Sequence, residues 1–393
     1  FMVVSIPDQY KPDTSSLAPL YKPDPEGLIT ATAGQGTSLL MLRYPVTGEF
    51  TMSIETGGGN DAEADLSYGG VNYPAVGWTQ KAKLIALGGN RSSEFPVPSI
   101  RRAKSNRETL RVSDRETVAI CNDQPYATDI TAKSFPWAAI SHIAHRTIRV
   151  KQFRIEGDVE IPSEVDLIEP TMRGWFTQSY AASLPDPMLP VASGQSTSEI
   201  VRERQKNRFQ AFTTTRTPSR KWYVKEHELK YDVGGSSRSY DPDSHFQYVR
   251  PLIDGDTVEM SFWWDAGTTE IHQAVGQTVL QLSAEGAKAV WSPVTNDLII
   301  NGYVPVDQLV PPQELMATEN VPIDDSWNKV TMTRDGDLIR VSLNEKQLAT
   351  MPIAGSARPG FMRRGKKNAW IRTIKLTGNW PSELPDDLTR RAD

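Results

Sequence analysis

The chain lacks features that would tie it to one redox compartment or to nucleic acid. It has one cysteine, Cys121, in 393 residues, so no internal disulfide can form. Its formal net charge is -5 and its pI is about 5.7, so it has no general excess of basic side chains to neutralise a phosphate backbone. These absences leave the redox compartment open and exclude nucleic acid from the expected partners.

Long apolar runs are also missing. No stretch of 18 or more apolar residues occurs, so we expect no transmembrane segment. The chain begins at Phe1 without a charged and apolar leader, so we expect any export signal to lie outside this sequence. Cys121 follows the alternating residues Val118 and Ile120. This pattern is typical of a buried strand and predicts that Cys121 lies in the core.

The sequence does have a long internal repeat. Four segments of the first half return in the same order in the second half. The pairs are Gly48–Glu55 with Asp256–Trp263, Ala75–Thr79 with Ala274–Thr278, Asn122–Thr128 with Asn344–Thr350, and Phe153–Gly157 with Ile374–Gly378. Four ordered matches indicate that the chain contains two copies of one domain.

Each copy has the pattern of antiparallel strands with one buried face. Apolar Phe50, Met52 and Ile54 alternate with polar residues, and Gly, Asn and Asp gather between such runs. Many short strands with few candidate helices predict an all-β protein made of two tandem concanavalin-A-like jelly-roll β-sandwiches. The expected parts are an extended lead-in over 1–30, a first sandwich over 31–169, a linker over 170–220 with a short helix at Ser198–Phe212, and a second sandwich over 221–393.

One segment invites a catalytic interpretation. Glu164, Asp166 and Glu169 form an E-x-D-x-x-E pattern, similar to the signature of jelly-roll glucanases, in which paired carboxylates act as nucleophile and acid. The repeat, however, places this segment after the closing strand of the first copy. We therefore expect an exit segment and assign no catalytic residue, while a polysaccharide hydrolase stays a third hypothesis.

Metal sites have weak sequence support. His142 and His145 are three residues apart, but no third ligand stands at a metal-like spacing, so we expect no zinc site. The acidic stretches Asn60–Asp65 and Asp241–Asp243 could donate oxygens to calcium, although neither matches the twelve-residue calcium loop. We expect no cofactor and leave calcium open.

Aromatic residues point to the second copy as the binding part. Seven of the ten tryptophans lie from Trp222 onward. Alternation from Met260 to Trp264 places Trp263 on the outer face, where the ring could stack on a sugar. Trp263 could instead pack under a loop or against the other domain. The candidate ligand-binding residues are Trp263, Arg250, His272 and Trp291.

The second copy also resembles a known family. Tyr248–Gly255, Trp291 and Ile374–Pro381 are similar to segments of large, uncharacterised secreted proteins of planctomycete bacteria, whose C-terminal regions are concanavalin-A-like and laminin-G-like. The resemblance implies a jelly-roll fold and export, but no reaction. Val290–Trp291 departs from the His-Trp pair that is common in that family, so no ligand site is carried over.

These observations lead to a ranked set of functions. We expect a non-catalytic secreted or cell-surface binding module of a bacterium, with a glycan as its first expected partner and a protein as another. The alternative is a structural surface component that self-associates through sheet edges or faces. Binding to glycans, self-association in solution and a carboxylate pair in a cleft discriminate these two functions and the hydrolase.

Overall fold

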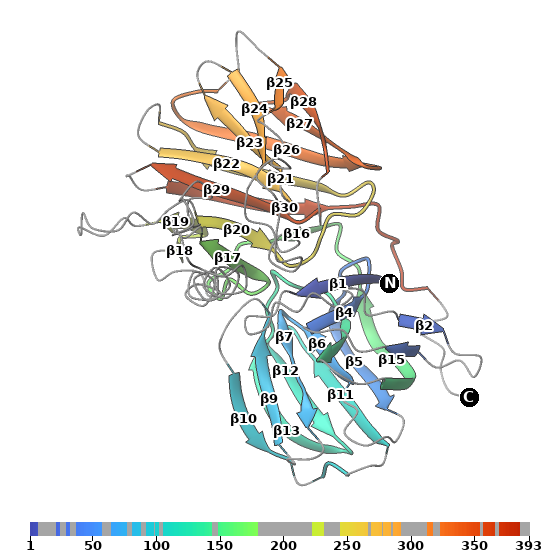
Figure 1. Cartoon of the computed structure of the whole chain (residues 1–393). Coiled ribbons are helices and arrows are strands. Elements are labelled where there is room, and N and C mark those ends of the chain that lie inside the picture. Colours follow the sequence, from blue (N-terminus) through green and yellow to red (C-terminus); the bar gives the residue numbers. More distant parts are fainter. Residues whose placement is uncertain are drawn as a thin grey trace, which may run out of the picture. The chain divides into compact units, whose positions relative to one another are not determined.

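The computed structural model describes most of the chain, and every regular element in the described part is a β-strand. The described residues are 1–6, 21–23, 29–31, 37–56, 64–76, 81–87, 92–97, 99–101, 105–143, 148–179, 222–231, 244–265, 269–276, 278–283, 286–291, 313–316, 323–353, 357–365 and 369–385. Two compact units are present, Phe1–Gly174 with Lys375–Asp393, and Trp175–Ile374. The protein is therefore all-β, as the alternation predicts (Figure 1).

The first unit is a sandwich of two antiparallel sheets. Sheet A has the order β1 (Met2–Ile6), β4 (Thr37–Met41), β14 (Ala139–Ile143), β6 (Ala64–Tyr68), β7 (Val71–Asn72), β9 (Lys81–Ala86) and β10 (Ser92–Pro96), with β8 (Ala75–Val76) also on β9. Sheet B has the order β13 (Gln124–Ile130), β12 (Glu116–Cys121), β11 (Asn106–Val112), β5 (Thr47–Thr56), β15 (Ile148–Glu160), β3 (Ile29–Ala31) and β2 (Tyr21–Pro23). Both sheets bury one face in a shared apolar core that includes Met52, Leu66 and Leu110.

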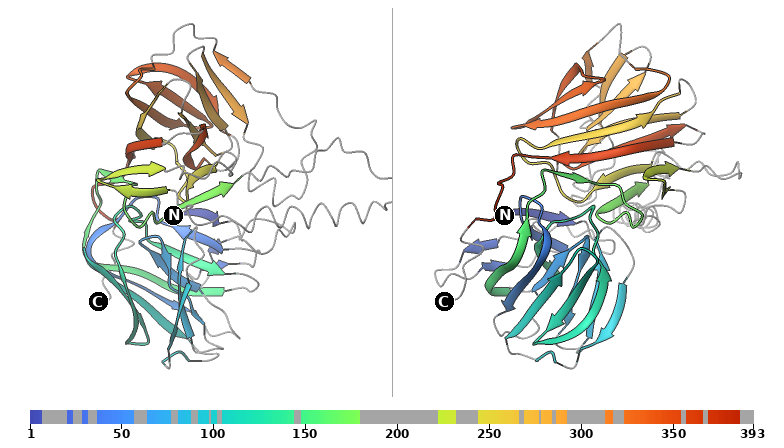
Figure 2. Two further views of the ribbon diagram at one scale, coloured as in Figure 1. Left: turned by 90° about the vertical axis from the view of Figure 1, so that its left-hand side faces the viewer. Right: turned by 180° about the vertical axis from the view of Figure 1, so that it is seen from behind.

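The second unit is built in the same way. Sheet C has the order β18 (Trp222–Lys225), β19 (Glu228–Tyr231), β30 (Ala369–Thr377), β21 (Thr257–Trp263), β26 (Trp327–Asp335), β27 (Leu338–Leu343) and β28 (Lys346–Pro352), and the end of β30 also pairs with β16 (Glu164–Asp166). Sheet D has the order β17 (Trp175–Ser179), β20 (Ser244–Tyr248), β29 (Pro359–Gly365), β22 (Thr269–Val275), β23 (Thr278–Ser283), β24 (Gly286–Trp291) and β25 (Gln313–Met316). Figure 2 shows the two layers of each sandwich.

The strand orders bear out the duplication. Sheet B, read from β13 to β2, has the same strand order as sheet C, read from β28 to β18. Sheets A and D correspond in the same way. A shared turn fixes the alignment. Asn122 accepts a hydrogen bond from the Arg107 amide and donates one to the Asn106 side chain, and Asn344 makes the same two bonds with Lys329 and Asn328.

The strand pairing corrects two of the sequence matches. Met52 lies opposite Leu110, and Val258 lies opposite Met332, the equivalent of Leu110. Met52 therefore corresponds to Val258 rather than to Met260. The match of Ala75 with Ala274 is also wrong. Ala274 directly precedes the residue pair that closes the β22–β23 turn, and Ser67 has the same place before the equivalent β6–β7 turn. Ala274 therefore corresponds to Ser67. A shift of two residues leaves the face of each strand unchanged, so the outward direction expected for Trp263 is unaffected.

The second sandwich begins earlier than the sequence indicates. Trp175–Ser179, expected in the linker, forms β17 and pairs with β20 in sheet D. Trp175 packs against Phe246 with a ring distance of 5.0 Å and against Tyr248 at 5.1 Å. The first sandwich also begins earlier than predicted, because β1, β2 and β3 fall in or at the end of the expected lead-in and pair in its two sheets. The rest of the lead-in and the expected helix at 198–212 lie outside the described residues.

Within the described part of the chain, no helix has the length and apolar character that crossing a membrane requires.

Candidate functional site

The candidate site is the outer face of sheet C, and alternation along β21 creates it. Val258, Met260 and Phe262 are at most 2% exposed, whereas the residues between them are half-buried. Trp263 ends this series on the outer side, and Trp264 turns back into the core. Because successive side chains of a strand point to opposite faces, the outward position of Trp263 follows from the strand itself. The outward position expected from the sequence is thus observed.

Trp263 belongs to a row of side chains that crosses five strands. Tyr223 on β18 pairs with Lys230 on β19, which pairs with Trp370 on β30. On the other side, Trp263 on β21 pairs with Trp327 on β26. We call Tyr223, Trp370, Trp263 and Trp327 the aromatic row. Tyr223 is 42% exposed and the three tryptophans are half-buried, so solvent reaches part of the row.

The three tryptophans of the row pack in edge-to-face pairs, with Trp263 in the middle. The ring centroids of Trp263 and Trp327 are 5.7 Å apart with an interplanar angle of 82°. Those of Trp263 and Trp370 are 6.0 Å apart with an angle of 74°. Aromatic pairs favour this edge-to-face geometry, which fixes the rings relative to one another. The row is therefore an ordered apolar surface rather than a set of independent side chains.

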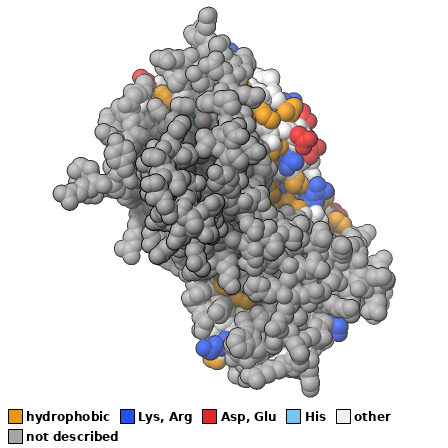
Figure 3. Space-filling model, in the orientation of Figure 1, with side chains coloured by type: hydrophobic (Ala, Val, Ile, Leu, Met, Phe, Trp, Pro, Cys, Tyr) orange, Lys and Arg blue, Asp and Glu red, His pale blue; other side chains and the backbone are white. Residues whose placement is uncertain are grey.

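Charged groups border the row. The Arg372 guanidinium carbon lies 4.1 Å from the Trp327 ring centroid, a cation–π contact. Glu228 pairs with Lys230 at 3.0 Å and with Arg372 at 3.5 Å. The hydrogen bond to Glu228 raises the pKa of the Lys230 ammonium, so this group stays protonated at neutral pH. Figure 3 shows hydrophobic, basic and acidic side chains side by side on the described surface at its upper right.

Among its described residues, the first sandwich has no such row. Trp327 corresponds to Ser105 and Arg372 to Lys151, since Asn328 corresponds to Asn106 and the closing strands match at Gly157 and Gly378. There Lys151 donates to Ser105 at 3.0 Å and pairs with Glu55 at 3.1 Å. The same two positions thus hold a lysine–serine hydrogen bond in one copy and an arginine on an indole ring in the other.

Arg250 is not part of the aromatic row, and its side chain is buried in the loop between β20 and β21. Its guanidinium pairs with Asp256 at 2.6 Å, and both side chains are almost fully buried. Asp256 also accepts the Ile253 amide at 2.9 Å. Arg250 therefore clamps the connection between β20 and β21, and its buried side chain is not part of the surface around Trp263.

The other two expected residues lie on sheet D. His272 on β22 is 0% exposed, and its Nδ1 accepts the Leu282 amide at 3.3 Å. Trp291 ends β24 and pairs with Thr278, while its side chain lies outside the described residues. The structure thus does not bring Trp263, His272 and Trp291 together, because the sequence pattern gives strand faces but not the order of strands between sheets.

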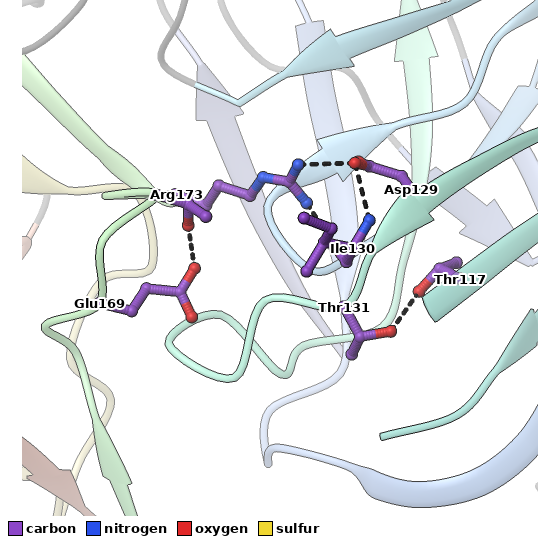
Figure 4. Close-up of polar contacts among 7 residues, drawn as sticks. Thr117, Asp129, Ile130, Thr131, Glu169 and Arg173 are labelled. Atoms are coloured by element: carbon purple, nitrogen blue, oxygen red, sulfur yellow. Dashed lines mark hydrogen bonds and ion pairs between the residues drawn. The ribbon is translucent and has the colours of Figure 1, made fainter. Parts of the chain in front are cut away.

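The carboxylates of the E-x-D-x-x-E segment hold loops in place. Glu164 pairs with Lys375 at 2.7 Å, and the Asp166 carboxylate accepts the Ile168 amide at 3.0 Å. Glu169 accepts the Ser134 amide at 3.0 Å and contacts the Thr171 hydroxyl. Figure 4 shows Glu169 near Arg173, which pairs with Asp129 at 2.8 Å beside the end of β13. These contacts favour the exit interpretation of the segment.

The metal hypotheses fall largely outside the described residues. The side chains of His142 and His145, the acidic residues 60–63 and the stretch 241–243 are among the residues that the structure leaves undescribed. Within the described ranges, no group of three or more His, Cys, Asp or Glu side chains could hold a metal ion.

Sequence reasoning missed three members of the row. Tyr223, Trp327 and Trp370 are far apart in the chain, and only strand order brings them beside Trp263. A signal was nonetheless present for the two tryptophans, because Trp327 precedes the buried Asn328 and Trp370 precedes the buried Ile371. Projecting every tryptophan of the second copy onto an outer face would have selected Trp327 and Trp370 as well.

Comparisons with known proteins identify two uncharacterised domain families. Residues 238–383 match a family model described as a domain of unknown function, DUF1583_N. Residues 109–221 match a model described as a protein of unknown function, DUF1581. Each match covers less than half of the chain, and the first includes most of the row. No curated protein matches the sequence.

Solved structures are similar to single sandwiches of this chain. The carbohydrate binding module CBM66 from Bacillus subtilis is 13% identical over 36% of this chain and 92% of that chain, with a TM-score of 0.30. Sheep galectin-11 in complex with glycerol is 10% identical over 32% and 97%, with a TM-score of 0.25. A putative glycosyl hydrolase from Parabacteroides distasonis is 10% identical over 40% and 83%, with a TM-score of 0.26. At these identities the likeness concerns the jelly-roll fold alone.

Proposed function

We propose that the protein is a non-catalytic carbohydrate-binding module, exported to the cell surface or beyond, and that it binds glycans on the aromatic row of its second sandwich. The observation that carries the proposal is the partly exposed row itself, which crosses five strands of sheet C. Soluble proteins rarely leave ordered apolar surface open without a binding role. The apolar face of a sugar ring is a fitting occupant for indole rings, because indoles offer flat apolar area at little entropic cost.

Polar groups beside the row suit the same occupant. Sugar hydroxyls need donors and acceptors near the stacking surface, since a buried hydroxyl without a partner costs free energy. Lys230 and Arg372 supply donors, and Glu228 supplies acceptor oxygens, all from β19 and β30. Ser261 lies on the outer face two residues before Trp263 and adds a hydroxyl. The difference between the two copies supports the proposal, since Trp327 and the arginine that lies on its ring, Arg372, occur where the first copy has Ser105 and Lys151.

A glycan array with the purified chain, followed by calorimetric titration of each hit, tests the proposal. Trp327→Ala and Trp263→Ala should each weaken binding about tenfold or more, because truncating a central aromatic side chain of an interface typically costs at least 2 kcal/mol. Both side chains lie on an outer face, where a cross-strand pair contributes about 0.2–1 kcal/mol, so the variants should still fold. Trp380→Ala, a half-buried tryptophan beyond β30, is the matched control and should bind like the parent chain.

Two results would count against the proposal. Glycan binding that survives both substitutions would place the site elsewhere on the chain. Absence of binding to every glycan, together with self-association that Trp263→Ala abolishes, would instead make the row an interface between copies of this chain.

A further inference from the structure

Two cations and one carboxylate from β19 and β30 lie beside the aromatic row. Lys230 and Arg372 both approach Glu228, at 3.0 Å and 3.5 Å. One carboxylate therefore serves two cations, and these three side chains together carry one net positive charge. The longer of the two contacts exceeds the usual length of a charge-assisted hydrogen bond. Arg372 is thus the less satisfied partner.

The guanidinium of Arg372 is oriented by its neighbours and partly exposed, so it can bind a further partner. It lies on the Trp327 ring at 4.1 Å, and its side chain is 53% exposed. Stacking on an indole orients the planar fork while its N–H donors stay at the edge of the plane. No hydrogen bond of this guanidinium occurs among the described residues. A carboxylate or a sulfate is the group that such a fork binds with two parallel hydrogen bonds.

Other cations of the same face differ from Arg372 in this respect. Lys329 on β26 has its own carboxylate, Glu259, at 3.1 Å. Arg340 on β27 pairs with Asp335 at 2.8 Å and is 56% exposed, so it is as accessible as Arg372 but already neutralised. Lys329 and Arg340 each have a carboxylate of their own, whereas Arg372 shares Glu228 with Lys230.

We infer that the glycan bound on the aromatic row is acidic, and that Arg372 pairs with a carboxylate or sulfate of a sugar while the rings contact its apolar face. This inference rests on the proposed function and narrows it to one class of sugar. Lys230 adds a second positive charge across Glu228 and raises the local potential. The Arg372 guanidinium then changes partner from Glu228 to the ligand without moving off Trp327.

Titration of the full chain with three polysaccharides tests the inference. The probes are polygalacturonate, which has carboxylates and no sulfate, dextran sulfate, which has sulfates and no carboxylate, and the neutral glucan laminarin, so the carboxylate and sulfate sources are separate arms. We expect at least one acidic probe to bind about tenfold or more tighter than laminarin, a difference of about 1.4 kcal/mol, because hydrogen bonds between charged groups are stronger than those between neutral ones. This advantage should shrink as salt is added.

Two variants of opposite sign make the test specific. Arg372→Gln should remove the preference for the acidic probe, whereas Glu228→Gln should strengthen acidic binding several-fold, because a competing carboxylate is lost. A purely structural role of the Glu228 pair would not produce a gain. Arg340→Gln is the matched control and should bind like the parent chain.

The outcomes separate the inference from the proposed function. Equal binding of laminarin and the acidic probes, with Trp327→Ala still disruptive, would overturn the inference and leave the glycan-binding function standing. Acidic binding that Arg372→Gln leaves unchanged would also overturn it. Failure of all three probes and of the glycan array would remove both.

Discussion

At the scale of single residues, burial separates side chains that hold the fold from those that can meet a ligand. Arg250 and His272 are 0% exposed, while Tyr223 is 42% exposed. Both kinds look alike in the sequence, because an arginine near a tryptophan is equally consistent with a buried ion pair and a binding site. The ion pair of Arg250 with Asp256 shows which of these applies here.

The buried ion pair yields a stability prediction. Asp256→Ala should lower the free energy of unfolding by about 3–5 kcal/mol, because it leaves the Arg250 charge buried without its partner. Urea unfolding measures the change. Asp335→Ala is the control, since its pair with Arg340 is more than half exposed and contributes at most about 1 kcal/mol. Equal effects of the two substitutions would contradict the role given to Asp256.

Cys121 offers a pH-dependent test of the first core. Burial, with a further contribution from Glu108, raises the pKa of its thiol to about 12. The folded state therefore holds the proton that the unfolded state releases above pH 9, so the contribution of this group to stability is present below that pH and is lost as the pH rises from 9 to 12.

Labelling with a thiol reagent tests whether the Cys121 thiol is buried and protonated in the folded chain. At pH 8 the native chain should react at least a hundredfold more slowly than the urea-unfolded chain, because the reactive thiolate is scarce and covered. Rapid labelling of the native chain would show that Cys121 is not a core residue.

At the scale of elements, the repeated Asn turn links sequence to topology. Asn122 and Asn344 both have a φ of 47°, and each is followed by an acidic residue that also has a positive φ. Two positive φ values are what a type I′ hairpin turn requires, and Asn tolerates this conformation better than other non-glycine residues. The side-chain bonds to the neighbouring strand then fix the position of the hairpin in the sheet.

Substitutions at this turn separate its two contributions to stability, the side-chain hydrogen bonds and the backbone conformation. Asn344→Ala should cost about 2–3 kcal/mol of unfolding free energy, since it loses two hydrogen bonds and puts Ala, which tolerates a left-handed conformation less well than Asn, at a φ of 47°. Asn344→Gly should cost about 1 kcal/mol less, because glycine relieves the strain but not the lost bonds. Chemical unfolding of both variants measures the difference. Identical stabilities would mean that the backbone conformation at this position carries no cost.

The elements could be predicted from the sequence better than their arrangement. Alternation of Met260 and Phe262 with polar residues predicted which side chains of β21 face the core, and the repeated Asn turns predicted that the domain is duplicated. Pairing of β21 with β26 and β30 depends on contacts between residues more than 60 positions apart, which no local pattern encodes. For this reason Trp263 was predictable as an outer residue, while its neighbours were not.

At the scale of the whole molecule, the two copies share a fold but differ on one outer face. Both copies keep the same strand orders and the same Asn turn, so the sandwich core is maintained twice. The outer face of sheet B has Lys151 bound to Ser105, whereas the equivalent face of sheet C has the aromatic row. Binding is therefore expected from the second sandwich, with the first retaining a polar face.

Hydroxyl-radical footprinting of the full chain, with and without the tightest glycan from the array, tests this assignment most directly. Oxidation is read residue by residue from peptides. Protection of Tyr223, Trp263, Trp327 and Trp370, with oxidation of Trp380 unchanged, is the result that binding on the aromatic row predicts. Protection confined to sheet D or to the first sandwich, with the four row residues oxidised as before, would contradict it.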